Sequence, residues 1–388
     1  MKRLGKILAI LALVAATAGV TFCVTWSELR ADASKDAAVR KVSEISQDLN
    51  EYFIDDYDET KLADAAADAM VKATGDRWSY YVSAADYASY EEQMNNAYVG
   101  IGVTIEQNDE AGGFTITAVT KGGPAEAAGV KVGDILVSVE GKSVKELGKS
   151  GTVNAVRGKE GTEVSLTFRR DGSEYTASIK RRSIHTPVAT YLMTDDKIGV
   201  VTIKNFDTNC SSETINAVNT LLAQGAKGLV FDVRNNPGGL KTELVKVLDR
   251  LLPEGPLFRS RDYAGRESVD SSDATCVKLP MAVLVNADSY SAAEFFAAAM
   301  QEYQAATVVG AKTVGKGNFQ NTFRLSDGSA IAISVGKYFT PHNRSLTNVG
   351  VTPDVPVALS EDSNEKLYAD QLPVKDDPQL QAALKAVR

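Results

Sequence analysis

Three short polar fragments each follow an apolar run of the strand type, and together they hold groups that could break an acyl bond. Two of the fragments carry candidate reactive side chains: Ser289 and Ser291 in "SYSAAE", and Lys316 in "TVGKGNFQ". The third, "NNPGG" at residues 235–239, places two adjacent glycines before a helical pattern. Because open α/β sheets bind ligands outside the carboxyl ends of their strands, we expect all three fragments to meet at one edge.

The serine fragment has two interpretations. Ser291 and Glu294 have the Ser-x-x-Glu spacing of a capping box, which predicts that Ser291 begins a helix and that Glu294 is its partner. Either Ser289 or Ser291 could instead be a nucleophile, and the local pattern does not separate them. The two interpretations are compatible, because the N–H that follows a serine at a helix start can also stabilise an oxyanion.

A lysine is the better candidate base, because the chain has only two histidines, His185 and His342, which we interpret as structural. Serine–lysine pairs are a known variant of serine catalysis. Burial lowers the pKa of a lysine, and a base works best near the ambient pH. Gln320, four residues after Lys316, could orient the amine through its amide oxygen. The alternative is that Lys316 is a solvated loop charge.

The paired glycines of "NNPGG", Gly238 and Gly239, predict an anion site. Glycine lets backbone N–H groups approach a ligand closely, and the following helix adds positive potential at its N-terminus. Such a site suits an oxyanion or a phosphate. The alternative is an ordinary strand-to-helix turn.

Composition narrows the function classes. The net charge of −8 argues against a general nucleic-acid partner. Two histidines and three cysteines exclude a histidine- and cysteine-rich metal cluster, and nothing in the sequence implies a metal or another cofactor. Cys210 and Cys276 could pair or stay free, and their spacing leaves both alternatives open.

The N-terminus has the pattern of a targeting segment. Basic residues precede a mostly apolar stretch, residues 7–26, that is long enough to span a bilayer. The basic flank predicts a single-pass anchor in a bacterial-type cell membrane, with the body outside the cytoplasm. Cleavage at the Ala-x-Ala of residues 31–33 would instead give a secreted or periplasmic protein.

In the rest of the chain, the sequence pattern changes twice. Residues 34–95 follow a helical pattern, and the next ninety or so read as short alternating strands with glycine and aspartate turns. From about residue 197, strands alternate with helices, which predicts a parallel α/β sheet. The polar stretch at residues 263–274 is expected to be a surface loop.

Taken together, the fragments resemble the carboxyl-terminal processing proteases, also called tail-specific proteases. The similarity covers nearly all of the chain after the apolar segment and depends on six motifs in the family's order. Trp78 and Tyr290 vary within these motifs, outside the catalytic positions. The motifs are "GDRWSYY" (75–81), "YVGIG" (98–102), "DVRNNPGG" (232–239), "SYSAAE" (289–294), "TVGKGNFQ" (313–320) and "GVTPD" (350–354).

The resemblance implies an α/β multidomain protein with a crotonase- or Clp-protease-like α/β catalytic core, an inserted β-rich PDZ domain and a helical N-terminal segment. The implied boundaries are 1–33 for the anchor or signal peptide, 34–95 for the helical segment, 96–183 for the PDZ domain, 184–360 for the serine protease core and 361–388 for a C-terminal helical segment.

The resemblance also implies a role for each motif residue. It makes Ser291 the nucleophile, Lys316 the base and Gln320 the residue that orients the base. The oxyanion hole would use the N–H groups of Gly238 or Gly239 and of Ala292. In the PDZ domain, the loop formed by Gly100, Ile101, Gly102 and Val103 would capture a peptide's terminal carboxylate.

The function expected from these assignments is a serine endopeptidase that cleaves the C-terminal region of extracytoplasmic proteins with exposed tails. The expectation leaves open the identity of the substrate and the oligomeric state, a homo-oligomer included. Two rivals remain: a catalytically silent PDZ adaptor, and an acyl-CoA-handling enzyme of the crotonase type.

Overall fold

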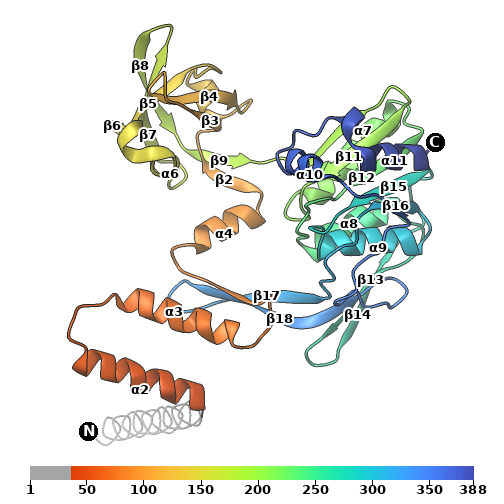
Figure 1. Ribbon diagram of the computed structural model, residues 1–388, viewed down its shortest axis with the longest axis horizontal. Coiled ribbons are helices and arrows are strands. Elements are labelled where there is room, and N and C mark those ends of the chain that lie inside the picture. The colour runs from red at the N-terminus through yellow and green to blue at the C-terminus, as the bar shows by residue number, and fades with distance from the viewer. Residues whose placement is uncertain (1–35) are drawn as a thin grey trace, which may run out of the picture. The chain divides into compact units, whose positions relative to one another are not determined.

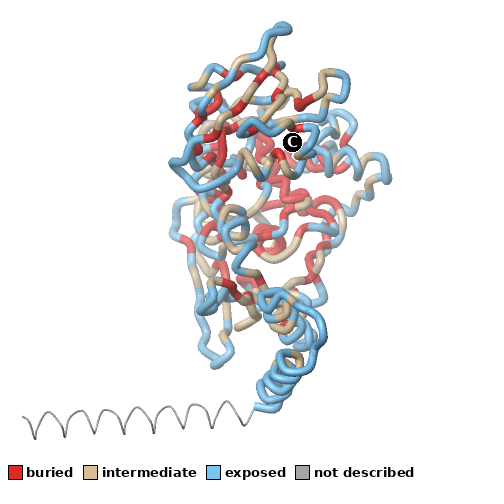
Figure 2. Tube along the Cα trace, turned by 90° about the vertical axis from the view of Figure 1, so that its left-hand side faces the viewer, coloured by how far each residue is buried: buried red, intermediate tan, exposed pale blue. Residues whose placement is uncertain are grey.

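The computed structural model describes residues 36–388, which divide into two units at Asp76 and Arg77. The expected apolar anchor at residues 7–26 lies outside the described residues. Among those described, no helix is both long and apolar enough to cross a membrane. The first unit contains α2 (Ala37–Tyr52) and α3 (Glu59–Lys72), shown in Figure 1. Helix α2 buries none of its residues, and most of it is exposed (Figure 2).

A six-stranded sheet forms the centre of the second unit, in the order β10-β11-β12-β15-β16-β19. Strand β10 pairs antiparallel with β11, and all other neighbours are parallel. Helices α7, α8 and α9 lie in the crossover connections between β11, β12, β15 and β16. The bounds are Ala189–Met193 (β10), Ile198–Ile203 (β11), Cys210–Ala223 (α7), Gly228–Asp232 (β12), Lys241–Leu251 (α8), Met281–Val285 (β15), Ala292–Glu302 (α9), Ala306–Gly310 (β16) and Val355–Pro356 (β19).

Different helices cover the two faces of this sheet. Because side chains alternate along a strand, Val201 and Ile203 of β11 pack under α7, α8 and α9. Ile198 and Val200 point the other way and pack under the C-terminal helix α11 (Pro378–Ala386). Both layers belong to the buried red segments of Figure 2. The sheet is thus a buried platform whose carboxyl ends carry the three polar fragments.

An antiparallel sheet in the order β1-β18-β13-β14, with β17 added to β18, completes the core. The expectation of a surface loop at residues 263–274 is wrong, because part of that stretch forms β14. The Asp262 carboxylate accepts hydrogen bonds from the N–H groups of Ala264 and Arg266, and this closes the hairpin. As an edge strand, β14 needs no apolar alternation. The bounds are Tyr80–Val82 (β1), Gly255–Asp262 (β13), Glu267–Ser272 (β14), Asn318–Arg324 (β17) and Ala330–Phe339 (β18).

The β-rich module has its own core and a sheet in the order β3-β4-β5-β7-β8, with β6 paired to β5. Strands β2 and β9 pair antiparallel where the chain enters and leaves the module. The bounds are Ala97–Gly100 (β2), Val103–Asn108 (β3), Gly113–Val119 (β4), Pro124–Ala127 (α5), Ile135–Val139 (β5), Lys142–Ser143 (β6), Val144–Val156 (α6), Glu163–Arg170 (β7), Ser173–Lys180 (β8) and Arg182–His185 (β9). The remaining elements are α4 (Tyr87–Met94), α10 (Glu361–Tyr368) and the 3₁₀ turn η1 (Val374–Asp376).

Candidate active site

Ser291 lies at the junction between β15 and α9 in a conformation that is rare for a side-chain-bearing residue. Its φ is 57° and its ψ is −125°, a combination that costs about 1–3 kcal/mol. Two hydrogen bonds hold the turn: the Ser291 N–H donates to Glu294 Oε2 at 3.1 Å, and the Tyr290 N–H donates to the Asn236 carbonyl at 3.1 Å. Ser291 is therefore the predicted helix cap, and Glu294 is the predicted partner.

The glycine loop touches the serine turn directly. At Gly238, whose φ is +94°, a Cβ would lie 2.6 Å from the Ser291 Cβ, so only glycine permits this approach. The Gly238 N–H donates to Asn236 Oδ1 at 2.8 Å, whereas Gly239 and Ala292 line the adjoining cavity. The N–H of Gly238 is therefore already used within the loop.

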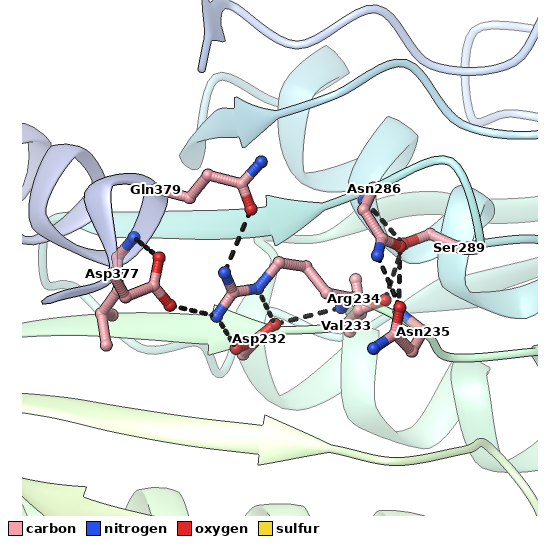
Figure 3. Close-up of polar contacts among 9 residues, drawn as sticks. Asp232, Val233, Arg234, Asn235, Asn286, Ser289, Asp377 and Gln379 are labelled. Carbon is pink, nitrogen blue, oxygen red and sulfur yellow. Dashed lines mark hydrogen bonds and ion pairs between the residues drawn. The ribbon is translucent and has the colours of Figure 1, made fainter. Parts of the chain in front are cut away.

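A polar network beneath the two loops ties them together (Figure 3). The Ser289 hydroxyl donates to the Val233 carbonyl at 2.7 Å and accepts from the Asn286 N–H at 3.0 Å. Asn286 also exchanges two hydrogen bonds with Asn235, at 2.9 and 2.6 Å. Ser289 is fully buried in this network. It therefore supports the turn from below, and Ser291 is the serine that faces the cavity.

A buried ion cluster anchors the same loop to the C-terminal segment (Figure 3). The Arg234 guanidinium lies 2.6 Å from an oxygen of Asp232 and 2.7 Å from an oxygen of Asp377, and donates to Gln379 at 3.0 Å. Burial opposes the charged form, but the two carboxylates raise the pKa of Arg234 above its ordinary value. The start of α11 is consequently part of the support for the glycine loop.

Glu294 joins the serine turn to the lysine loop. Its carboxylate accepts from the Thr313 hydroxyl at 2.5 Å and from the N–H groups of Gly315 and Lys316 at 2.6 and 2.9 Å, besides that of Ser291. Burial raises the pKa of the Glu294 carboxyl, although these hydrogen bonds partly oppose the rise. One buried side chain thus fixes the backbone of both candidate catalytic residues.

The Lys316 side chain lies against two aromatic rings, which belong to the two residues that vary within the family's motifs. Its Nζ is 4.8 Å from the centroid of Trp78 and 6.0 Å from that of Tyr290. The two rings stack on each other with centroids 5.7 Å apart. Trp78 and Tyr290 therefore form part of the surroundings of the lysine, a role that their separation in sequence concealed.

Tyr338 is a residue of the site that no sequence pattern predicted. Its hydroxyl lies 2.9 Å from the Ser291 hydroxyl, and its ring packs edge-on against Phe295 with centroids 4.3 Å apart. The Tyr338 N–H also donates to the Gly317 carbonyl of the lysine loop. Burial raises the pKa of Tyr338 well above its ordinary value, so the hydroxyl stays protonated. No sequence motif marks Tyr338, because it lies near the end of the ordinary strand β18.

These groups line one cavity of about 560 Å³. Ser291, Lys316, Gln320, Gly239 and Ala292 all contribute to its wall, as does Tyr338. The Gln320 amide nitrogen donates to Ser334 Oγ at 2.9 Å. The three fragments thus meet at the carboxyl edge of the sheet. This is the edge predicted from their positions directly after the strands.

Other candidate residues lie elsewhere. His185 contacts Glu213, and His342 lies 3.9 Å from Glu302; neither histidine lines the cavity. Both cysteines in the described part of the chain, Cys210 and Cys276, are free thiols.

The loop of Gly100, Ile101, Gly102 and Val103 belongs to the β-rich module. It connects β2 to β3, with Ile101 buried and Gly102 at a φ of +79°. Strand β3 pairs with β4 on one side only, so its outer edge can pair with an added strand.

Comparison with known proteins agrees with this architecture. Residues 197–357 match peptidase family S41, and residues 99–180 match the PDZ domain. A probable CtpA-like serine protease of Staphylococcus haemolyticus is 34% identical over 360 residues, which cover 91% of this chain and 72% of that protein. A solved S41 protease structure from Bacteroides fragilis superimposes with a TM-score of 0.50 at 17% identity, over 82% of this chain and 89% of that one, and supports the fold alone.

A probable CtpA-like serine protease of Staphylococcus aureus (strain N315) is 35% identical over 325 residues. The match covers 83% of this chain, but this chain spans only 65% of the length of that relative.

Proposed function

Because the chain belongs to the carboxyl-terminal processing proteases, a family with an S41 peptidase region and a PDZ domain, we propose that it is a serine endopeptidase. Its substrates would be extracytoplasmic proteins with exposed C-terminal tails. The observation that carries the proposal is the shared cavity in which Ser291, Lys316 and the Gly239 loop meet.

The chemistry follows the Ser–Lys variant of acyl transfer. Ser291 Oγ attacks the scissile carbonyl while the neutral Lys316 amine accepts the hydroxyl proton. The N–H groups of Gly239 and Ala292 donate to the oxygen that becomes negative, and each such donor contributes about 3–4 kcal/mol. Lys316 then gives the proton to the leaving amine, and water hydrolyses the acyl-enzyme by the reverse sequence.

Two further side chains position the pair. The Gln320 amide nitrogen is held by Ser334, which leaves its carbonyl oxygen as the acceptor for the lysine amine. The Tyr338 hydroxyl lies 2.9 Å from Ser291 Oγ. In this mechanism it would donate to that oxygen while the serine proton passes to Lys316. Tyr338 would therefore aim the nucleophile and stabilise the charge on Oγ as the proton leaves.

Substrate capture would use the PDZ domain. A peptide tail would add as a strand to the open edge of β3, with its terminal carboxylate on the N–H groups of Ile101, Gly102 and Val103. The body of the protein would lie outside the cytoplasm, tethered by residues 7–26 or released by cleavage near residues 31–33. Fractionation of cells that make the full chain, together with the mass of the mature N-terminus, tests this placement.

The decisive experiment compares the two serines of one motif. The full chain, Ser291→Ala and Ser289→Ala are incubated with a folded protein that ends in an unstructured tail, and new C-termini are identified by mass spectrometry. Ser291→Ala should lower the cleavage rate at least 1,000-fold, in line with loss of the nucleophile. Ser289→Ala should still cleave, with a lower melting temperature, because it removes only a buried support.

Cleavage by Ser291→Ala at the parental rate would refute the mechanism. If neither the parent nor the variants cleave but all bind the tail equally, the chain would be a PDZ adaptor. Hydrolysis of thioesters without any tail cleavage would indicate the crotonase-type alternative.

A further inference from the structure

The active-site cavity contains a carboxylate that the proposed mechanism does not use. Asp207 lines the cavity together with Gly239 and Ser291. Its Oδ1 atom is buried and makes no hydrogen bond to any residue in the described part of the chain. Buried polar atoms are almost always paired, so an orphaned carboxylate oxygen in a binding cavity calls for a ligand.

The position of Asp207 is fixed by backbone contacts. The Asp207 N–H donates to Asn205 Oδ1 at 3.0 Å, and its carbonyl accepts from the Cys210 N–H at 3.0 Å. The residue before it, Phe206, bridges to Gly239, so the two segments lie side by side. A Cβ at Gly239 would lie 2.7 Å from Asp207 Oδ1, which places the carboxylate against the oxyanion loop.

The charges nearby do not neutralise Asp207. Two lysines also line the cavity. The Lys241 amine lies 2.8 Å from an oxygen of Asp270, and the Lys316 amine lies over the ring of Trp78. The charge of Asp207 also raises the pKa values of Tyr80 and Cys210, so both side chains lie within its electrostatic reach. Burial raises the pKa of both groups, for Cys210 to about 12, so both are neutral near pH 7.

We propose that Asp207 forms a specificity subsite for a lysine or arginine side chain of the peptide, close to the scissile bond. This inference builds on the proposed protease function. A cationic side chain in the cavity would pair with the Asp207 carboxylate, whose charge a neutral hydroxyl or amide could meet only with a hydrogen bond. It would also cancel a negative charge that otherwise lies beside the developing oxyanion, so the preference appears in kcat as well as in KM.

The subsite has a pH signature. Burial raises the pKa of the Asp207 carboxyl to about 7. The carboxyl is therefore largely neutral at pH 5.5 and largely ionised at pH 8, and only the ionised form pairs with a cation. The ratio of rates for a lysine peptide and an isosteric neutral peptide isolates this effect, because both peptides depend on Lys316 in the same way.

The test uses one cleaved tail peptide in which lysine or norleucine is placed, one position at a time, at the three residues on each side of the cleavage site. For the parent, one position should favour lysine at least 10-fold in kcat/KM at pH 8 and less than 3-fold at pH 5.5. Asp207→Asn should lose the preference at both pH values while still cleaving the norleucine peptide. Asp196→Asn, which removes one charge at an exposed turn, should keep it.

Equal rates for lysine and norleucine at every position, or an unchanged preference in Asp207→Asn, would overturn the subsite without touching the protease proposal. Fluorescence anisotropy of the same peptides with Ser291→Ala measures their affinity for the subsite without cleavage. If the parent cleaves no peptide, the protease function fails, and the lysine-to-norleucine binding ratio still decides the subsite.

Discussion

Beneath the glycine loop the charged groups are paired within the protein, whereas the cavity above it holds a carboxylate oxygen without a partner. Arg234 is held by Asp232, Asp377 and Gln379, all of them largely withdrawn from solvent. Phe206, the residue before Asp207, forms a β-bridge with Gly239 of the same loop. One oxygen of the Asp207 carboxylate has no hydrogen-bond partner in the described part of the chain. The two regions share a loop but differ in what completes their hydrogen bonds.

The difference separates positioning from recognition. A buried polar network whose members are all satisfied rigidifies the backbone that it touches. An unsatisfied group at the same depth carries a desolvation cost that a ligand can relieve. We therefore expect substitutions in the paired region to lower stability, and substitutions on the cavity face to change rate, specificity or pH dependence.

The largest effect should come from breaking the buried ion cluster. Arg234→Met leaves two carboxylates, Asp232 and Asp377, buried without their cation, and should lower the free energy of unfolding by about 3–5 kcal/mol. Urea denaturation measures the change. Lys366→Met, which breaks an exposed pair with Asp362, should change the free energy of unfolding far less, because water screens that pair. Equal losses in the two variants would remove the distinction between the regions.

Glu294 tests whether one side chain can serve both regions. Glu294→Gln replaces an acceptor of four hydrogen bonds with an amide whose NH₂ faces N–H donors, so the lysine loop should loosen. We expect kcat to fall about 100-fold, or about 2.7 kcal/mol, as well as a lower melting temperature.

The matched control is Glu243→Gln, another buried carboxylate, which binds Ser211 and does not contact the lysine loop. It should lower the melting temperature and leave kcat within 3-fold of the parent. A comparable loss of kcat in both variants would mean that Glu294 acts through general stability alone.

The sequence predicts the paired half of the site better than the open half. The three polar fragments each follow a strand of a parallel sheet, so their meeting at one edge follows from order along the chain. The capping-box spacing likewise predicts the contact between Ser291 and Glu294, which the structure has at 3.1 Å. Local spacing is sufficient wherever strand ends or a single helical turn bring residues together.

Tyr338, Asp207 and Trp78 were out of reach for the same approach. Tyr338 and Asp207 lie in segments whose local pattern is ordinary. Trp78 lies in a motif, but the motif does not place it beside the lysine. All three reach the site only through tertiary pairing. Tyr338 arrives through the antiparallel sheet that contains β18, and Asp207 through the bridge between Phe206 and Gly239. The edge strand β14 was missed for a related reason, because an exposed polar strand has no apolar alternation to reveal it.

Tyr338 gives a smaller effect, confined to chemistry. Tyr338→Phe removes one oxygen, 2.9 Å from Ser291 Oγ, and keeps the packed ring. We expect kcat to fall about 10-fold, or about 1.4 kcal/mol, with KM nearly unchanged. Tyr303→Phe, which loses a 2.9 Å hydrogen bond to the Pro256 carbonyl, should keep the parental kcat. A change in KM alone would assign Tyr338 to substrate binding instead of to the nucleophile.

The smallest effect is a stability change whose size depends on pH. The pKa of Asp207 is raised by burial to about 7, whereas an unfolded aspartate titrates near 3.9. Between these values the folded chain binds more protons than the unfolded chain, so ionisation of Asp207 weakens folding as the pH rises. Asp207→Asn lacks this penalty. It should be more stable than the parent by about 1 kcal/mol at pH 8 and nearly equal to it at pH 4.5, since the open cavity screens part of the charge.

Denaturation of both proteins at the two pH values measures the difference, and Asp196→Asn corrects for the general loss of a negative charge. If Asp207→Asn were destabilised at pH 8, the carboxylate would have a partner within the protein. It would then belong with the paired groups beneath the loop, and it would no longer be available to a cationic side chain of the substrate.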